Sequence, residues 1–60
     1  MKKVTILLKS SVENGRVPQG LLHYNNTIEI YYKNNYLILV DEMREQATFT
    51  LDEIEYMEIN

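Results

Sequence analysis

The residues of this chain that could do chemistry are one histidine, two adjacent serines and nine carboxylates. A hydrolytic triad could be drawn on paper from the following side chains: Ser10 or Ser11, His23, and Asp41 or Asp52. Such a triad also needs a nucleophile on a tight turn, an oxyanion hole and a pocket that excludes water. The sequence has no motif that supplies these parts. We therefore predict that His23 is a surface or turn histidine and that the protein is not an enzyme.

Two other arrangements, a phosphate loop and a calcium-binding carboxylate cluster, lack parts that their chemistry needs. Gly15 and Gly20 have the separation found in a phosphate-binding loop, but Leu21 and Leu22 stand where its lysine and hydroxyl should be. The carboxylates gather at 41–45 and 52–58 without the spacing of a calcium loop. No cysteine is present to bind a metal or form a disulfide. We predict no cofactor and no metal, and we interpret the carboxylates as a solvated acidic face.

The five tyrosines are more than a core of this size can bury. Tyr31 and Tyr32 are adjacent, so in a strand they point to opposite faces and at least one lies outside the core. An exposed tyrosine suits a protein interface and can also stack on an unpaired base, although ordinary cross-strand packing is an equal alternative. The candidate partner-binding residues are strand residues and carboxylates near the last strand: Tyr24, Tyr31, Tyr32, Tyr36, Leu37, Leu39, Asp52, Glu53 and Glu55.

The elements that must position these residues begin with an amphipathic strand over 3–9, with Val4, Ile6 and Leu8 on one face. A polar connection over 10–15 follows, with a turn at residues 14–15. Pro18 cannot donate to a ladder, so we expect the next strand to start at about Leu21 and to end in a turn at residues 25–26.

Four runs of β-type residues then follow, at 27–32, 36–40, 47–51 and 54–59. In the first we expect Ile28, Ile30 and Tyr32 to point inward, and in the third Ala47, Phe49 and Leu51. Residues 34–35 predict a tight hairpin, and 41–46 a charged hairpin connection or one helical turn. The run 36–40 is apolar on both faces, which is typical of a central strand or of one covered by a partner.

Residues 50–53 fit a capping box, so we interpret 54–59 as a strand preceded by one helical turn, with a terminal helix as the alternative. These elements predict one small domain over residues 1–60. Its class is all-β and mainly antiparallel. We expect a five- or six-stranded bent sheet or an SH3-like or Sm-like barrel, with a short helical turn near 41–46 or 51–53.

Residues 14–25 resemble the Sm-like small β-barrel pattern, in which Gly-Arg and a second glycine open a bent strand; here these are Gly15, Arg16 and Gly20. Residues 49–57 are similar to the closing strand of that family. The resemblance covers about a third of the chain, and it implies a strongly bent five-stranded barrel that forms rings or dimers. The Arg-Gly turn that contacts RNA in Sm-like proteins is replaced by Leu51, Asp52 and Glu53, and the usual N-terminal helix is missing, which disfavours RNA binding.

The distribution of charge and the length of the chain further limit the possible functions. Residues 1–33 carry five basic and two acidic side chains, whereas residues 41–58 carry seven acidic and one basic. If strands of the basic and acidic segments interleave, these charges are solvated or paired. If the two segments lie on different faces, the resulting dipole favours a basic partner or head-to-tail association. A 60-residue core rarely supplies more than about 3–5 kcal/mol, so self-association is also expected. No apolar stretch approaches a membrane span or a signal peptide, and we expect a soluble, cytoplasmic protein.

These observations favour a small interaction module that binds a protein partner, or itself as a dimer or higher oligomer, through a tyrosine-bearing face or an open sheet edge. A regulatory or inhibitory protein of a phage or mobile element would suit this size and composition. Two alternatives stay open. One is single-stranded nucleic-acid binding, which the net charge of −3 disfavours. The other is an acidic mimic of nucleic acid that occupies a basic site on an enzyme.

Overall fold

The fold is a single antiparallel sheet of five strands in the order β4-β3-β2-β1-β5. The structure is a computed structural model that describes residues 1–17 and 19–60, so the expectation about Pro18 lies outside the described residues. Along the chain the elements are β1 (Lys2–Leu8), α1 (Lys9–Glu13), β2 (Leu21–Lys33), β3 (Tyr36–Asp41), β4 (Gln46–Thr50), the 3-10 turn η1 (Leu51–Glu53) and β5 (Ile54–Ile59). The predicted all-β, mainly antiparallel class is confirmed.

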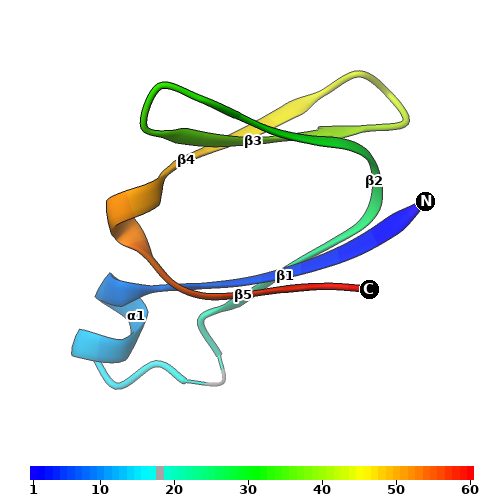
Figure 1. Cartoon of the computed structure of the whole chain (residues 1–60). Coiled ribbons are helices and arrows are strands. Elements are labelled where there is room, and N and C mark those ends of the chain that lie inside the picture. The colour runs from blue at the N-terminus through cyan, green and yellow to red at the C-terminus, as the bar shows by residue number, and fades with distance from the viewer. Residues whose placement is uncertain (18) are drawn as a thin grey trace.

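The long strand β2 bends the sheet into two layers. Its first half pairs with β1 and its second half with β3, and both ladders shift register next to Thr27. Figure 1 shows β2 curving from the layer of β1 and β5 to the layer of β3 and β4. The turn predicted at Asn25 and Asn26 is therefore wrong. These exposed asparagines lie where the strand changes partner, so they mark a bend in the strand and not a reversal of the chain.

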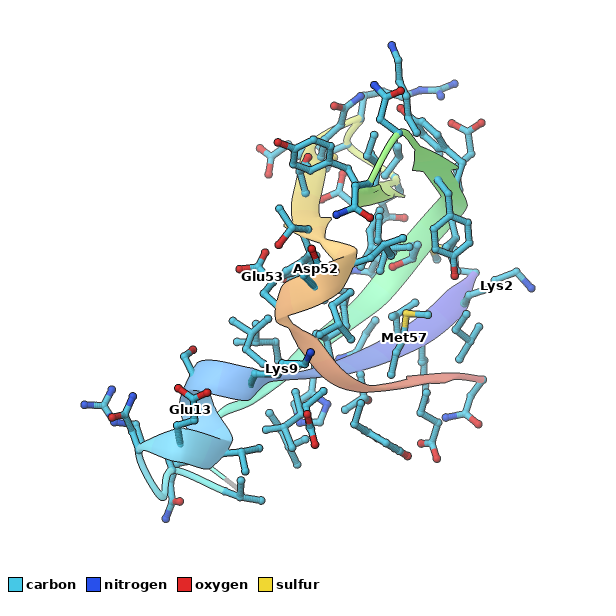
Figure 2. The ribbon with its side chains drawn as sticks, turned by 60° about the vertical axis from the view of Figure 1, so that its left-hand side comes forward. Lys2, Lys9, Glu13, Asp52, Glu53 and Met57 are labelled. Atoms are coloured by element: carbon cyan, nitrogen blue, oxygen red, sulfur yellow. The ribbon has the colours of Figure 1, made fainter. Side chains whose placement is uncertain are left out.

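The hydrophobic core lies between the two layers. Its buried members come from three strands and are Val4 and Ile6 of β1, Leu37 and Leu39 of β3, and Phe49 of β4. Leu8, Ile30 and Ala47 pack against them, as their strand faces predict. Figure 2 shows Met57 projecting from β5 toward the opposite layer, where it also packs on the core.

Three residues that were predicted to point into the core are exposed. A register shift between Thr27 and Glu29 buries Thr27 and leaves Ile28 39% exposed. Tyr32 shares the inner face with Leu37, its partner in the ladder, but is 58% exposed because it lies near the end of the hairpin. Leu51 belongs to η1 and not to β4, so it leaves the alternation of the strand.

The polar connection predicted at 10–15 contains a short helix, α1, that sequence periodicity did not indicate. The turn at residues 14–15 is confirmed, and it ends this helix: Gly15 has φ +66° and donates its amide to the carbonyl of Val12. Gly20 lies so close to α1 that a Cβ atom there would collide with Ser11. Because Gly20 has no Cβ atom, the chain passes this close to α1 before β2 begins at Leu21.

The connections among the last three strands follow their local signals. Asn34, with φ 56°, turns the predicted hairpin between β2 and β3. Residues 42–45 form a hairpin connection, not a helix. The predicted capping box is present, since the side chains of Thr50 and Glu53 each accept a bond from the other's backbone amide. The last segment is a strand, as predicted, and the terminal-helix alternative is wrong.

The sheet does not close into a barrel. β4 and β5 stand at opposite ends of the strand order, and no ladder joins them within residues 1–17 and 19–60. The expected five-stranded bent sheet is thus confirmed, whereas barrel closure, which the Sm-like resemblance implied, is not found. The 3-10 turn η1 joins β4 to β5, which lie in different layers.

Candidate functional site

The two terminal strands of the sheet offer unpaired backbone groups to a partner along their outer sides. An edge strand presents a row of amides and carbonyls that can pair with another chain. In the described part of the chain β4 and β5 stand at the two ends of the strand order, while β1 and β3 pair on both sides and each half of β2 pairs on one side. The two edges differ in their charges and in the space beside them.

The amides of β4 alternate between β3 and solvent. Leu51 donates its amide to the carbonyl of Asn35 at 2.9 Å, so the amides of Phe49 and Ala47, two and four residues earlier, also point toward β3. Gln46, Thr48 and Thr50 therefore direct their amides to the open side. The Thr50 amide is already occupied by Glu53 Oε1 at 2.8 Å. The open edge of β4 thus offers two amides, those of Gln46 and Thr48.

The side chains of β4 do not guard this edge. The strand Gln46–Thr50 contains no charged residue and no proline, which are the usual means of blocking strand addition. Charge begins only beyond its two ends, where the acidic residues are Asp41, Glu42 and Glu45 before it and Asp52 and Glu53 after it. Figure 2 shows Asp52 and Glu53 on η1. The β4 edge is therefore a neutral strand between two acidic ends.

The β5 edge is acidic along its length. Lys3 and Asn60 exchange backbone hydrogen bonds, so alternation directs the amides of Met57 and Ile59 to solvent. Glu55 and Glu58 lie exposed on this strand. Glu58 accepts a hydrogen bond from the hydroxyl of Tyr56 at 3.0 Å, and this bond, with lesser effects of burial and of the Glu58 charge, raises the pKa of Tyr56. Edge carboxylates disfavour strand addition.

A cavity of about 150 Å³ opens at the first end of β4. Its lining residues are Tyr24, Thr27, Leu39, Asp41, Glu45, Gln46 and Ala47. The Tyr24 ring meets the ring of Phe49 edge to face at a centroid distance of 5.9 Å, and partial burial raises the pKa of Tyr24. Asp41 Oδ1 accepts the amides of Met43 at 2.8 Å and of Glu45 at 2.9 Å, which fixes its carboxylate at the rim.

The structure distributes the predicted site residues over several surfaces. Tyr31 and Tyr36 lie on the outer face of the hairpin, 38% and 44% exposed, whereas Tyr32 lies on the inner face and Tyr24 lines the cavity. Tyr31 and Tyr32 do point to opposite faces, as predicted. The four tyrosines do not form one stacking platform.

The two apolar candidates of β3 lie in the core. Leu37 is fully buried and Leu39 is 2% exposed, so neither presents a docking surface. The outward residues of the same strand, Ile38 and Val40, are also buried. Both lie between ladder partners in β2 and β4 of the same chain. The central position predicted for 36–40 is confirmed, since β3 lies between β4 and β2.

The acidic candidates Asp52, Glu53 and Glu55 lie on η1 and β5. Within the described residues, no group of three carboxylate or histidine side chains converges so that it could hold a metal ion. Sequence reasoning missed Gln46, Thr48 and the cavity beside Ala47. The available signal was the absence of charge in 46–50, the only β-type run after residue 40 without a carboxylate.

Comparison with known proteins gives no match to a family model, a curated protein or a solved structure. Among the described residues, no helix is long and apolar enough to cross a membrane.

Proposed function

We propose that this protein is a non-enzymatic binding module that adds an extended strand of a partner protein to the open edge of β4. The observation that supports this proposal is the pair of outward amides, those of Gln46 and Thr48, on a strand without charge or proline. In strand addition, backbone hydrogen bonds supply affinity and the alternating side chains of the guest supply specificity. The guest needs no particular fold, only an extended segment of about five residues.

The charges around β4 favour a basic guest. Acidic side chains lie beyond both ends of the strand, and the one basic residue there, Arg44, has its guanidinium 3.9 Å from the carboxylate of Glu29. A lysine-bearing guest strand would meet opposite charge at both ends, which speeds association and fixes register. The binding should weaken with added salt, since these carboxylates are exposed.

A second copy of this chain is a poorer guest. In an antiparallel pairing of two β4 edges, the acidic residues 41–45 of one copy would lie near Asp52 and Glu53 of the other. In a β4-to-β5 pairing, Glu55 and Glu58 would lie near one of the same acidic ends. Like charges at this separation oppose docking. We therefore assign the β4 edge to a different, basic protein segment, with pairing between copies as an outcome that the experiment can reveal.

The tyrosines of the outer face can add contact area to the same site. Tyr36 is the ladder partner of Thr50, so it lies one strand away from the open edge, and Tyr31 lies on the next strand of the same face. Long side chains of a guest strand could cross Thr48 or Thr50 and reach these rings. Tyrosine in this position gives large contact area at low entropic cost.

The test uses an acetylated and amidated heptapeptide of alternating lysine and valine, labelled for fluorescence anisotropy. We expect saturable binding that weakens with salt. The matched peptides replace every lysine by glutamate, or carry a methyl group on every backbone nitrogen. Both should bind at least tenfold more weakly, because one reverses the charge and the other cannot donate to an edge. Equal binding of the N-methylated peptide, or no binding of the lysine peptide at millimolar concentration, would overturn the proposal.

A further inference from the structure

The cavity at the first end of β4 lies beside Ala47, which is on the inner face of the edge strand. Leu39 is the ladder partner of Ala47, so the row across the inner face runs from Leu39 to Ala47 and then to the open edge. A guest strand on β4 would place its own inner-face side chain next in this row. Ala47 is small, which leaves room for that side chain to enter the cavity.

The cavity combines an apolar wall with an acidic rim. Tyr24, Leu39 and Ala47 supply aromatic and aliphatic surface, and Asp41 and Glu45 supply the carboxylates. Asp41 Oδ1 receives two backbone amides, which leaves Oδ2 without a donor from the described residues. A side chain that matches both the apolar wall and the acidic rim has an aliphatic stem and a terminal positive charge.

The cavity is large enough for such a guest. Its volume of about 150 Å³ is about ten times the space that one water needs in a cavity. A lysine side chain, with five non-hydrogen atoms beyond its Cα atom and a compact terminal cation, fits this space.

We propose that this cavity binds the alkylammonium side chain of a lysine in the partner strand. The lysine stem lies along Leu39 and Ala47, and its ammonium donates to Asp41 Oδ2 and to the Glu45 carboxylate. This proposal rests on the proposed strand addition for the delivery of the lysine, but the affinity of the cavity for an alkylammonium group can be measured without a strand.

The first experiment titrates the ¹⁵N-labelled protein with N-acetyl-lysine methylamide and follows amide chemical shifts. The control ligand is N-acetyl-norleucine methylamide, which has the same stem without the charge. We expect saturable shifts at Gln46 and Ala47 with the lysine ligand, and at least tenfold weaker binding of the norleucine ligand. Equal affinities of the two ligands, or no shifts near the cavity, would overturn the proposal.

The second experiment changes the rim. Asp41→Asn keeps an oxygen for the amides of Met43 and Glu45 but removes the charge, and it should weaken the lysine ligand about tenfold. Glu45→Gln is a second variant that leaves the bonds to Asp41 intact and should weaken the ligand in the same direction. Asp52→Asn, at the other end of β4, is the matched control and should leave the affinity unchanged. An equal effect of Asp41→Asn and Asp52→Asn would refute a local site.

The two proposals fail in different ways. If the lysine and valine heptapeptide binds but neither Asp41→Asn nor replacement of its lysines by norleucine one at a time lowers its affinity, strand addition stands and the lysine cavity is refuted. If N-acetyl-lysine methylamide binds at the cavity but the heptapeptide does not bind, the cavity stands and strand addition is refuted.

Discussion

The two terminal edges of this sheet present similar backbone amides to solvent, but only one of them carries charged side chains. Each directs two amides to solvent, those of Gln46 and Thr48 on β4 and those of Met57 and Ile59 on β5. β5 carries Glu55 and Glu58, whereas β4 carries no charge. Natural sheets protect their free edges with charge, proline or a bulge, so the lack of charge and proline on β4 supports the proposal that a partner strand binds there.

The largest expected effect is a loss of folding stability, which depends on the direction in which the β4 amides point. Ala47→Pro removes an amide that faces β3, so we expect a loss of about 3–5 kcal/mol, which is the whole stability of a domain of this size. Thr48→Pro removes an amide that faces solvent and should stay folded. Urea unfolding followed by circular dichroism measures both. A folded Ala47→Pro beside an unfolded Thr48→Pro would reverse the assignment.

The next largest effect is on peptide affinity, and it distinguishes the β4 edge from the β5 edge. Thr48→Pro should raise the dissociation constant of the lysine and valine heptapeptide at least tenfold, because it removes one of the two free amides of β4. Ile59→Pro is the matched change on β5, where the amide also faces solvent, and it should leave the dissociation constant unchanged. Anisotropy titrations of the three proteins give the answer. If Ile59→Pro is the variant that loses binding, β5 is the binding edge.

A smaller effect concerns the capping box at the end of β4. Glu53→Ala removes the acceptor of the Thr50 amide, so we expect a loss of about 1 kcal/mol in the free energy of unfolding. Asp52→Ala is the control: its carboxylate accepts only an exposed bond from the Asn35 side chain at 3.2 Å, and the loss should be under about 0.5 kcal/mol. Equal losses in urea unfolding would show that the cap adds nothing to β4.

The smallest effect is the ionisation of the tyrosine beside each edge. The pKa of Tyr24 is raised by burial and that of Tyr56 mainly by its bond to Glu58. A raised pKa means that the folded state prefers the neutral phenol. The stability that Tyr24 contributes is therefore complete below pH 10, the ordinary tyrosine pKa, and is lost as the pH rises through its raised value.

A titration of tyrosinate absorbance measures these two groups, with Tyr24→Phe and Tyr56→Phe to assign them. Glu58→Gln should lower the pKa of Tyr56 toward its ordinary value and leave Tyr24 unchanged. A shift of Tyr24 in the Glu58→Gln protein would show that the two sites are coupled, against the separation of the edges drawn here.

The parts of the fold that sequence predicted are those with a local cause. The strand over 3–9 follows from alternation, and the hairpin at 34–35 and the capping box at 50–53 follow from turn and cap chemistry. The bend at Asn25 was misread because an asparagine pair marks a reversal and a change of strand partner equally well. α1 was missed because it is too short to show a helical period.

The candidate site was harder to predict from the sequence because it depends on contacts between distant parts of the chain. Which amides of β4 face solvent depends on the register with β3, and which strands are edges depends on the order of all five. The tyrosine surplus was visible in the sequence, but its division between two faces and a cavity needed the ladders. The absence of charge in 46–50 was visible too, and it gains meaning only beside an acidic second edge.

The most direct test of the account is amide hydrogen exchange of the protein with and without the lysine and valine heptapeptide. Strand addition at β4 predicts that the amides of Gln46 and Thr48 become protected while those of Met57 and Ile59 exchange as before. Protection at Met57 and Ile59, or bound peptide with no change at Gln46 and Thr48, would contradict it.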